Sequence, residues 1–376
     1  MALSLFNHTF CPKRLKDFTF SKTTSSILQS QIEHTQYYIK ETKKYNINNM
    51  IIFGTDGCGK RARAHAFLNE LFDIPDICKQ IDVKRYTLRY KNNKYEYSVI
   101  VSPYHIEFNL ADHGVNDYYI IKDYIKKISG TNNVYTNSPH IILIPHFNKT
   151  TLKAQLFFRR TMEKEIKNIR FIFTSSNLNI EKALLSRCVL IKVSTPSLKK
   201  IKSILKKIIS DQLPDIKKIV SKSQIDKMLE GVIFQTRQQT PSIYNLKQSI
   251  HNLQLSINHT DKSFNLYIDP NMKLIYNLNK IINNTKILTK SVYENINSIL
   301  YELYTNNYDF QNLLKHLVFN LLESNILKNK IVEIIQKSSD VSHKMAIGKH
   351  DIIPIQGFIF DIIQSKQKIN NQHINL

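Results

Sequence analysis

The sequence predicts an α/β fold with a largely parallel sheet in its first half and purely helical regions after it. Up to about residue 195, short apolar runs alternate with amphipathic stretches, a pattern typical of strands separated by helices. From Pro196 onward the apolar residues recur at helical spacing. A glycine-rich loop between the first apolar run and a helical stretch provides the strand–loop–helix context of a phosphate-binding loop.

Seven apolar segments are expected to form strands. They are residues 50–53, 83–90, 95–101, 105–109, 141–144, 170–174 and 189–193. The second and third of these flank the turn-like sequence Lys91-Asn92-Asn93-Lys94, which suits a hairpin. Pro196 follows the last strand and marks the end of the α/β region.

Helices are expected between these strands and throughout the rest of the chain. The segments are 62–71, 151–165, 198–209, 223–229 and 242–255. From about residue 270, apolar residues such as Ile281, Ile282, Ile287 and Leu288 stand at helical spacing. The Asn- and Lys-rich segment 256–272 is the best candidate for a linker.

The composition is strongly basic. A net charge of +23 and a pI near 9.6 favour a polyanionic partner, above all nucleic acid. The alternative interpretation of the lysine excess is an AT-rich genome, which the abundance of Asn, Ile and Lys together indicates. A chain of 376 residues with 42% hydrophobic content has room for two or three domains with real cores.

Metal-ligating spacings are missing from the sequence. Neither the cysteines (Cys11, Cys58, Cys78 and Cys188) nor the 13 histidines are spaced as zinc ligands near one another, so no structural metal is expected. The cysteines fit a reducing compartment. The N-terminus does not read as a signal peptide and no apolar run approaches the length of a membrane span, so no membrane partner is expected.

The glycine-rich loop matches the pattern G-x-x-x-x-G-K in full, as Gly54-Thr55-Asp56-Gly57-Cys58-Gly59-Lys60. Its backbone N–H groups would close around phosphates, and Lys60 would reach the outer ones. The next residue is Arg61, where a magnesium-binding Ser or Thr belongs, and a guanidinium has no acceptor atom for a metal. The alternative is that this loop is only a turn.

The second strand of the usual nucleotide site lacks its acids. After residues 140–144 the chain continues Pro145-His146-Phe147-Asn148, without a carboxylate to hold Mg²⁺ or to polarise water. Hydrolysis by this chain is therefore not expected. His146 takes the place of an acid, but nothing nearby in the sequence orients it as a general base.

Three further motifs point to a family. They are Arg159-Arg160-Thr161-Met162-Glu163, then Ser186-Arg187-Cys188, and the stretch from Tyr104 to Asn109 followed by Asp112 and Gly114. Together with the phosphate loop, they resemble the small subunits of the sliding-clamp loader, replication factor C, of the AAA+ class. The third motif is most similar to the subunit-3 branch of that family.

The resemblance implies an architecture and partners. It implies an AAA+ nucleotide-binding core over residues 1–195, a helical lid over 196–258 and an all-helical collar for oligomerisation over 259–376. The expected partners are the other subunits of a heteropentamer, a ring-shaped sliding clamp and primer–template DNA. The expected location is the nucleus, or a cytoplasmic replication site for a viral protein. Two other roles stay open: an active DNA-dependent ATPase, and a non-catalytic adaptor in a checkpoint-type clamp loader.

The resemblance also implies roles for single residues. Arg187 is the arginine presented to a neighbour's ATP, unless it is a plain surface arginine. Asn177 matches the polar sensor of the family, with Ser175 and Ser176 as alternatives, and Lys247 matches the later sensor arginine. The pocket would hold ATP or ADP with weak dependence on Mg²⁺, or nothing.

Two readings are open for each of two basic segments. Arg159 and Arg160 either organise an interface or form helix-face salt bridges with Glu163. The DNA-facing candidates are Lys149, Thr150, Thr151 and Lys153, at the start of a helix. Phosphate contacts from such groups would position the protein without reading base sequence. The two threonines are equally good helix N-caps.

Overall fold

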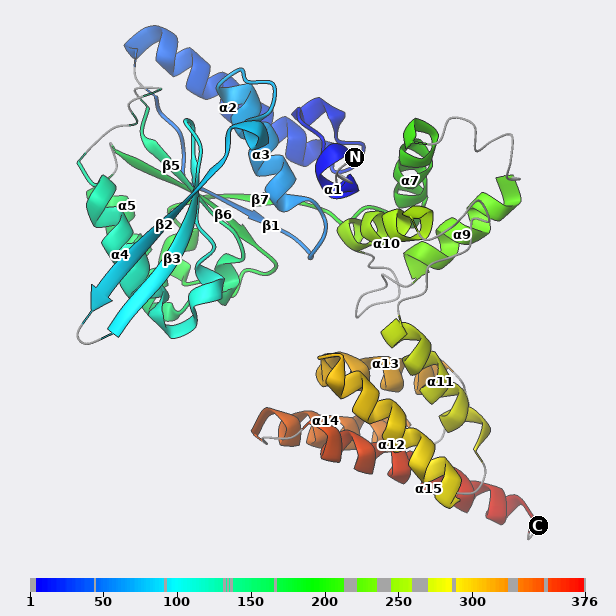
Figure 1. Ribbon diagram of the computed structural model, residues 1–376. Coiled ribbons are helices and arrows are strands. Elements are labelled where there is room, and N and C mark those ends of the chain that lie inside the picture. The colour runs from blue at the N-terminus through cyan, green and yellow to red at the C-terminus, as the bar shows by residue number, and fades with distance from the viewer. Residues whose placement is uncertain are drawn as a thin grey trace. The chain divides into compact units, whose positions relative to one another are not determined.

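The computed structural model separates into two compact units, residues 1–266 and 267–376 (Figure 1). It describes residues 5–43, 45–90, 93–130, 133, 135, 138–165, 168–212, 222–234, 245–258, 270–285, 289–323, 331–347 and 351–374. The expected division between core and lid, at residues 195 and 196, lies inside the first unit. The expected start of the collar, at residue 259, lies outside the described residues.

A seven-stranded sheet forms the centre of the first unit, with strand order β2-β3-β4-β5-β6-β1-β7. The strands are β1 (Met50–Phe53), β2 (Asp82–Tyr90), β3 (Asn93–Val101), β4 (Ile106–Glu107), β5 (His140–Ile144), β6 (Ile169–Ser175) and β7 (Val189–Lys192). From β4 to β7 all neighbours are parallel, and β2 and β3 form the expected antiparallel hairpin at one edge. All seven expected strands are confirmed. The fourth is shorter than expected.

The short β4 has a local cause. A turn over residues 102–105 precedes it, in which Ser102 N–H donates to the His105 carbonyl at 2.8 Å. The Ser102 hydroxyl oxygen also accepts from the His105 N–H at 3.0 Å. This turn takes His105 out of the ladder that joins β3 to β4. Beyond the strand, Phe108 N–H still donates to Leu143 of β5.

Alternate residues of the central strands face two separate apolar layers, as the period of two in a strand requires. Met50, Ile52 and Leu143 lie in one buried cluster, whereas Ile51 and Ile144 lie in the other. The first cluster is covered by α2 (Lys22–Thr42), α3 (Lys60–Leu71), α7 (Leu198–Gln212), α9 (Lys222–Phe234) and α10 (Leu246–Asn258). The second is covered by α4 (Asp117–Ile128) and α5 (Leu152–Lys164) (Figure 1).

Smaller helices complete the first unit. They are α1 (Phe6–Thr9), η1 (Leu15–Asp17), η2 (Ile77–Gln80), η3 (Leu110–Asn116), η4 (Phe147–Lys149) and α6 (Lys182–Leu185). The expected helices at 62–71, 151–165, 198–209 and 223–229 are confirmed as α3, α5, α7 and α9. For the segment 242–255, the described part is α10, and residues 242–244 lie outside the described residues.

The second unit is all-helical over its described residues. Its helices are α11 (Pro270–Asn284), α12 (Lys290–Thr305), α13 (Phe310–Glu323), α14 (Ile331–Ile347) and α15 (Ile352–Ile374). They share one apolar core that includes Ile282, Leu300, Leu317 and Ile359. Among the expected apolar positions, Ile287 and Leu288 lie outside the described residues, as does most of the expected linker. Over the described residues, no helix has the length and hydropathy needed to cross a bilayer.

Candidate nucleotide site and interface residues

The phosphate loop follows β1 at the edge of the sheet where β5 and β6 also end. A Cβ on Gly54 would lie 2.4 Å from the carbonyl oxygen of Val193, so only glycine fits beside the strand. Gly57 and Gly59 have φ of +76° and +82°, in the left-handed region that favours glycine. Helix α3 begins at Lys60, and its first N–H groups have no partners within the helix. The loop therefore has the backbone of an anion site.

A residue from the helix α10 region lies against this loop. The Asn245 side-chain oxygen would be 1.7 Å from a Cβ placed on Gly57. The same oxygen accepts from Gln248 N–H at 3.1 Å, which makes Asn245 the N-cap of α10. The sequence offered no signal for this contact, because the two residues are far apart in the chain.

The Lys60 ammonium group lies within the loop. It donates to the carbonyl oxygens of Gly54 at 2.6 Å and Thr55 at 2.8 Å, and it lies 3.4 Å from Asp56. Its side chain is 8% exposed. The buried Thr55 hydroxyl has no hydrogen-bond partner. A phosphate group would offer the ammonium and this hydroxyl the acceptors that fit them.

Arg61 turns away from the phosphate loop to Glu107 of β4. Its Nε and Nη2 atoms bind the two carboxylate oxygens at 2.7 and 2.8 Å. Glu107 is 3% exposed and His65 Nε2 lies 3.4 Å from it. The ion pairs hold the pKa of Glu107 below its usual range, against the burial that would raise it. Arg61 thus links α3 to the sheet.

The residues after β5 hold the neighbouring strand ends together. His146 has φ of +51°, and Asn148 Oδ1 accepts from Ser176 N–H at 3.2 Å and from the Ser175 hydroxyl at 3.4 Å. An amide that is used in this way cannot replace a catalytic carboxylate, because it is neutral. Asn177 is exposed, and its side-chain oxygen accepts from Asn179 N–H at 3.1 Å.

The charges around His146 are mostly positive. Partial burial lowers the pKa of its imidazole. Asp56 opposes this shift, whereas three cations add to it: Lys149, Lys60 and Lys247. Lys247 is exposed on α10. The strand ends therefore present a positive field that suits an anion such as a nucleotide phosphate.

Arg187 is joined to the other family motif. Its Nε and Nη2 atoms lie 3.0 and 2.6 Å from Glu163, and Nη1 donates to the Ala183 carbonyl at 2.7 Å. The Arg187 side chain is 38% exposed. Glu163 thus pairs with Arg187 rather than with Arg159 or Arg160, which lie on its own helix. Spacing along one helix could not indicate a pair that joins α5 to the chain before β7.

The four DNA-facing candidates differ in whether their side chains already form contacts within the protein. Lys149 is exposed, and the Lys153 ammonium lies 4.5 Å from the Tyr119 ring centroid. Thr150 donates its hydroxyl to Phe147 at 2.7 Å, and Thr151 caps α5 by accepting from Ala154 N–H at 3.3 Å. The N-cap reading of Thr151 is therefore confirmed, and the DNA reading of all four stays a prediction.

Buried Asp117, at the start of α4, supports that cap. It accepts from both the backbone N–H and the hydroxyl of Thr151 at 2.7 Å. The sequence had offered no reason to single out this carboxylate.

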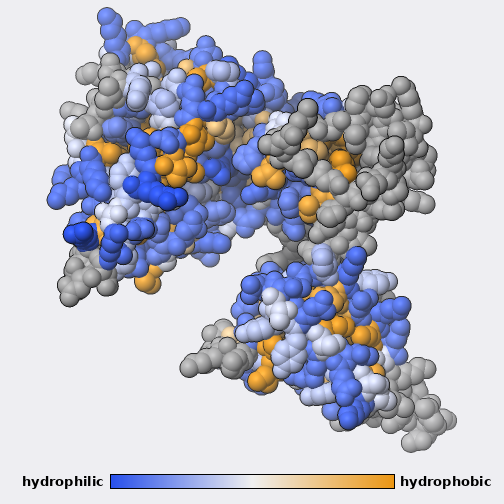
Figure 2. Space-filling view, viewed as in Figure 1, coloured by the Kyte–Doolittle hydropathy of each residue, from blue (hydrophilic) through white to orange (hydrophobic). Residues whose placement is uncertain are grey.

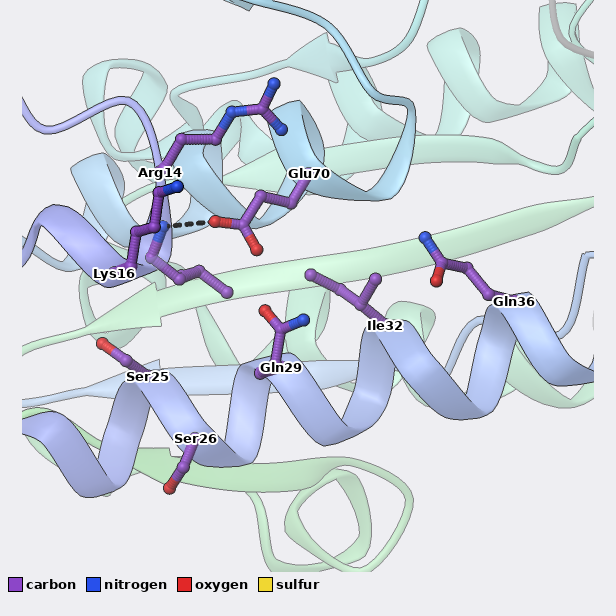
Figure 3. A pocket seen from close by; sticks show the side chains of 9 residues that line it. Arg14, Lys16, Ser25, Ser26, Gln29, Ile32, Gln36 and Glu70 are labelled. Atoms are coloured by element: carbon purple, nitrogen blue, oxygen red, sulfur yellow. Dashed lines mark hydrogen bonds between the residues drawn. The ribbon is translucent and has the colours of Figure 1, made fainter.

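A separate hollow of about 610 Å³ lies between α2 and the chain around η1 (Figure 3). Arg14, Lys16, Ser25 and Gln29 line it, and Leu15 N–H donates to Glu70 at its upper side. The lining is mixed, because Leu15 and Ile32 lie among the polar side chains, and it belongs to neither the phosphate loop nor the motif residues. The face of the first unit in Figure 2 is largely hydrophilic, with apolar residues in small groups.

Comparison with known proteins supports the resemblance drawn from the motifs. The chain is 26% identical to replication factor C subunit 5 of Saccharomyces cerevisiae over 374 residues, 96% of this chain and 99% of that protein. It is 32% identical to replication factor C subunit 3 of Mus musculus over 161 residues, 42% of this chain and 45% of that one. With subunit 5 of Neurospora crassa the identity is 30% over 210 residues, 54% and 56% of the two chains.

The second and third of these matches span about half the length of those relatives. No family model matches the chain. Among solved structures, the RuvB branch-migration motor of Thermotoga maritima aligns over 84% of this chain and 91% of that one, with 12% identity and a TM-score of 0.41.

Proposed function

We propose, from the premise that this chain is related to the replication factor C small subunits, that it is a non-hydrolysing subunit of a DNA sliding-clamp loader. The relatives by name belong to a multi-subunit replication factor, which supports a role in DNA replication. The observation that carries the finer proposal is the Arg187–Glu163 pair. It unites the two motifs that distinguish this family from other chains with a phosphate loop.

Loss of hydrolysis follows from the chemistry of the strand ends. No carboxylate follows β5, and the Asn148 amide is hydrogen-bonded to the end of β6. Arg61 is engaged with Glu107 and offers no oxygen to a metal. Without Mg²⁺ ligands or a general base, phosphoryl transfer has lost its electrostatic support. The loop amides and Lys60 would still hold ATP or ADP by its phosphates.

Arg187 would act on a neighbouring subunit. The Glu163 carboxylate and the Ala183 carbonyl hold all three guanidinium nitrogens in a half-exposed position. A guanidinium presented in this way can stabilise charge that develops on the γ-phosphate of a neighbour's ATP. Arg187 would then be a catalytic residue of the assembly, although this chain does not hydrolyse ATP.

The partners of this role are the other subunits of a heteropentamer, a ring-shaped clamp and primer–template DNA. Lys149 in η4 and Lys153 in the first turn of α5 supply positive charge for the DNA backbone. The assembly would be located in the nucleus, as the eukaryotic relatives suggest, or at a cytoplasmic replication site if the protein is viral.

The test is ATP hydrolysis by the reconstituted complex. Arg187→Ala should leave the fold and this chain's own nucleotide binding unchanged, and should slow hydrolysis at the adjacent site by about 10³-fold or more. Arg187→Lys should rescue poorly, because an ammonium group cannot match the planar guanidinium. The control is Arg85→Ala, an exposed arginine on β2. Equal rates for wild type and Arg187→Ala would remove the proposed mechanism.

The other two roles make different predictions. If the chain is an active DNA-dependent ATPase, the isolated protein turns over ATP above background when DNA is added. If it is a checkpoint-type adaptor, it co-purifies with small clamp-loader subunits and a different large subunit. Identifying the co-purified subunits therefore distinguishes a checkpoint-type adaptor from a subunit of the proposed assembly.

A further inference from the structure

Three buried polar side chains meet between α3 and β4, beside the phosphate-loop helix. His65 lies on α3, His105 precedes β4, and Glu107 lies in β4. Their exposed fractions are 8%, 1% and 3%, and one donor atom from each lies within 4.8 Å of the others. Three groups that could each ligate a metal are therefore gathered in the interior, outside the nucleotide site.

The hydrogen bonds of His105 leave one ring nitrogen without a partner. Nδ1 lies 2.7 Å from the Ser102 hydroxyl, which also lies 3.1 Å from the His105 carbonyl. If the hydroxyl donates to that carbonyl, its oxygen accepts the Nδ1 proton, and Nε2 then carries a lone pair. Nε2 is buried and has no hydrogen-bond partner. A bound cation would fill this position.

His65 has a matching arrangement. Its Nδ1 lies 3.3 Å from the sulfur of Cys78, which can accept a proton from it, and its buried Nε2 makes no hydrogen bond shorter than its contact with Glu107. Nε2 lies 3.4 Å from Glu107 Oε2. That separation is the ligand–ligand distance of a tetrahedral site with bonds of about 2.0–2.1 Å, which is the range of zinc. Both histidines thus have an outer partner at Nδ1, as metal-binding histidines do.

The alternative to a bound metal is a metal-free network of ion pairs among these side chains, which does not explain the position of His105. A proton on His65 Nε2 would satisfy Glu107, but it would leave Nε2 of His105 without a partner in the interior, which is unfavourable for a buried polar atom. Arg61 binds both oxygens of Glu107, with Nε at 2.7 Å from Oε1 and Nη2 at 2.8 Å from Oε2. A metal at Oε2 would displace the Nη2 contact, which the half-exposed Arg61 side chain can give up while its Nε stays on Oε1.

We propose that His65 Nε2, His105 Nε2 and Glu107 bind one divalent transition-metal ion, with zinc as the chemical class. Three protein ligands leave a coordination position for water. The ion would tie α3, whose N-terminus carries the phosphate loop, to β4. Sequence spacing predicted no metal because His65 and His105 are 40 residues apart and only the turn before β4 brings them together.

The first test needs no variant. The full-length chain, stripped with a chelator and titrated with Zn²⁺ alone, should bind one equivalent. X-ray absorption at the zinc edge should report nitrogen and oxygen ligands at about 2.0–2.1 Å, with scattering from imidazole rings. Absence of a stoichiometric site, or a spectrum with sulfur in the first shell, would overturn the proposal.

Variants then locate the site. His105→Gln should abolish the one-to-one binding, whereas His34→Gln, at an exposed histidine on α2, should leave it unchanged. Ser102→Ala keeps all three ligands but removes the acceptor of the Nδ1 proton, and should weaken zinc binding by about 10–100-fold. Unchanged zinc binding in His105→Gln would show that the metal is bound elsewhere on the chain.

Discussion

At the scale of single residues, the contact between Glu163 and Arg187 predicts that removing the carboxylate has a smaller effect than removing the guanidinium. Glu163→Gln keeps an acceptor for the guanidinium but removes the charge, so Arg187 stays close to its present position. Because the pair is half exposed, the free energy of unfolding should fall by no more than about 1 kcal/mol. ATP hydrolysis by the assembled complex should fall far less than with Arg187→Ala.

The measurements are urea unfolding of the chain and ATPase of the complex, with the exposed Glu33→Gln of α2 as the matched control. If Glu163→Gln slows the complex as severely as Arg187→Ala while stability is unchanged, Glu163 itself takes part in the chemistry. Glu163 would then no longer be only a positioning residue.

Arg63 is a second residue whose role only the fold reveals. It is 0% exposed, with Nη1 3.0 Å from the Ser25 hydroxyl and Nη2 2.7 Å from the Phe20 carbonyl. Its guanidinium lies 4.2 Å from the Phe18 ring centroid, and burial lowers its pKa to about 10. Arg63 therefore ties α3 to the N-terminal segment.

Arg63→Lys should destabilise the first unit by about 2–3 kcal/mol. A single ammonium cannot reach both acceptors and stack on the ring, so at least one buried charge-assisted hydrogen bond is lost. Chemical unfolding measures this, with Arg85→Lys on the exposed hairpin as the control. A change below about 0.5 kcal/mol would mean that the site adapts to lysine.

Local patterns predicted some of these residues and could not predict others. The glycines of the phosphate loop and the N-cap at Thr151 follow from neighbours in the sequence, and the structure places both as expected. Arg61 directly follows the phosphate loop in the sequence, and in the structure its guanidinium lies on Glu107, 46 residues away. Partners of long charged side chains depend on which strand lies beside which helix, and no short-range pattern encodes that.

At the scale of elements, the phosphate loop and α3 predict nucleotide binding that depends little on Mg²⁺. The loop offers amides and Lys60 to the phosphates, whereas Arg61 and the neutral side chains after β5 offer a metal no anionic ligand. Fluorescent-nucleotide titrations with Mg²⁺ and with a chelator should therefore give similar affinities.

Lys60→Ala is the matching variant for this titration. It removes charge-assisted hydrogen bonds of about 1.5–3 kcal/mol and should weaken binding by about 10–100-fold. Lys22→Ala, at an exposed position of α2, is the control. A strong requirement for Mg²⁺ would mean that a ligand for the metal comes from elsewhere in the chain.

The strands and helices themselves were largely predictable. Strand residues alternate between two apolar layers or form short apolar runs, and the helices of the second unit have a period near 3.6, so both follow from local sequence. The length of β4 did not follow, because the Ser102 turn removes His105 from the ladder. The contact of Asn245 with Gly57 did not follow either, since it depends on how α10 packs within the first unit.

At the scale of the whole molecule, 53 basic and 30 acidic residues give the net charge of +23. Such an excess can serve DNA binding or only reflect an AT-rich genome, and salt dependence distinguishes the two. If lysines neutralise phosphates, the logarithm of DNA affinity falls linearly with the logarithm of salt concentration, and base sequence has little effect.

Variants of Lys149 and Lys153 test whether the residues around the start of α5 contact DNA phosphates. Replacing both by Ala should reduce the salt slope by about one to two units, because each phosphate contact contributes about 0.9. The control removes the same charge from the second unit, through Lys273→Ala and Lys280→Ala on α11, and should leave the slope nearly unchanged. Equal effects of the two double variants would show that net charge alone attracts the DNA. An unchanged slope in the first would show that Lys149, in η4, and Lys153, in α5, face solvent rather than DNA; the Lys153 ammonium already has the Tyr118 and Tyr119 rings as neighbours.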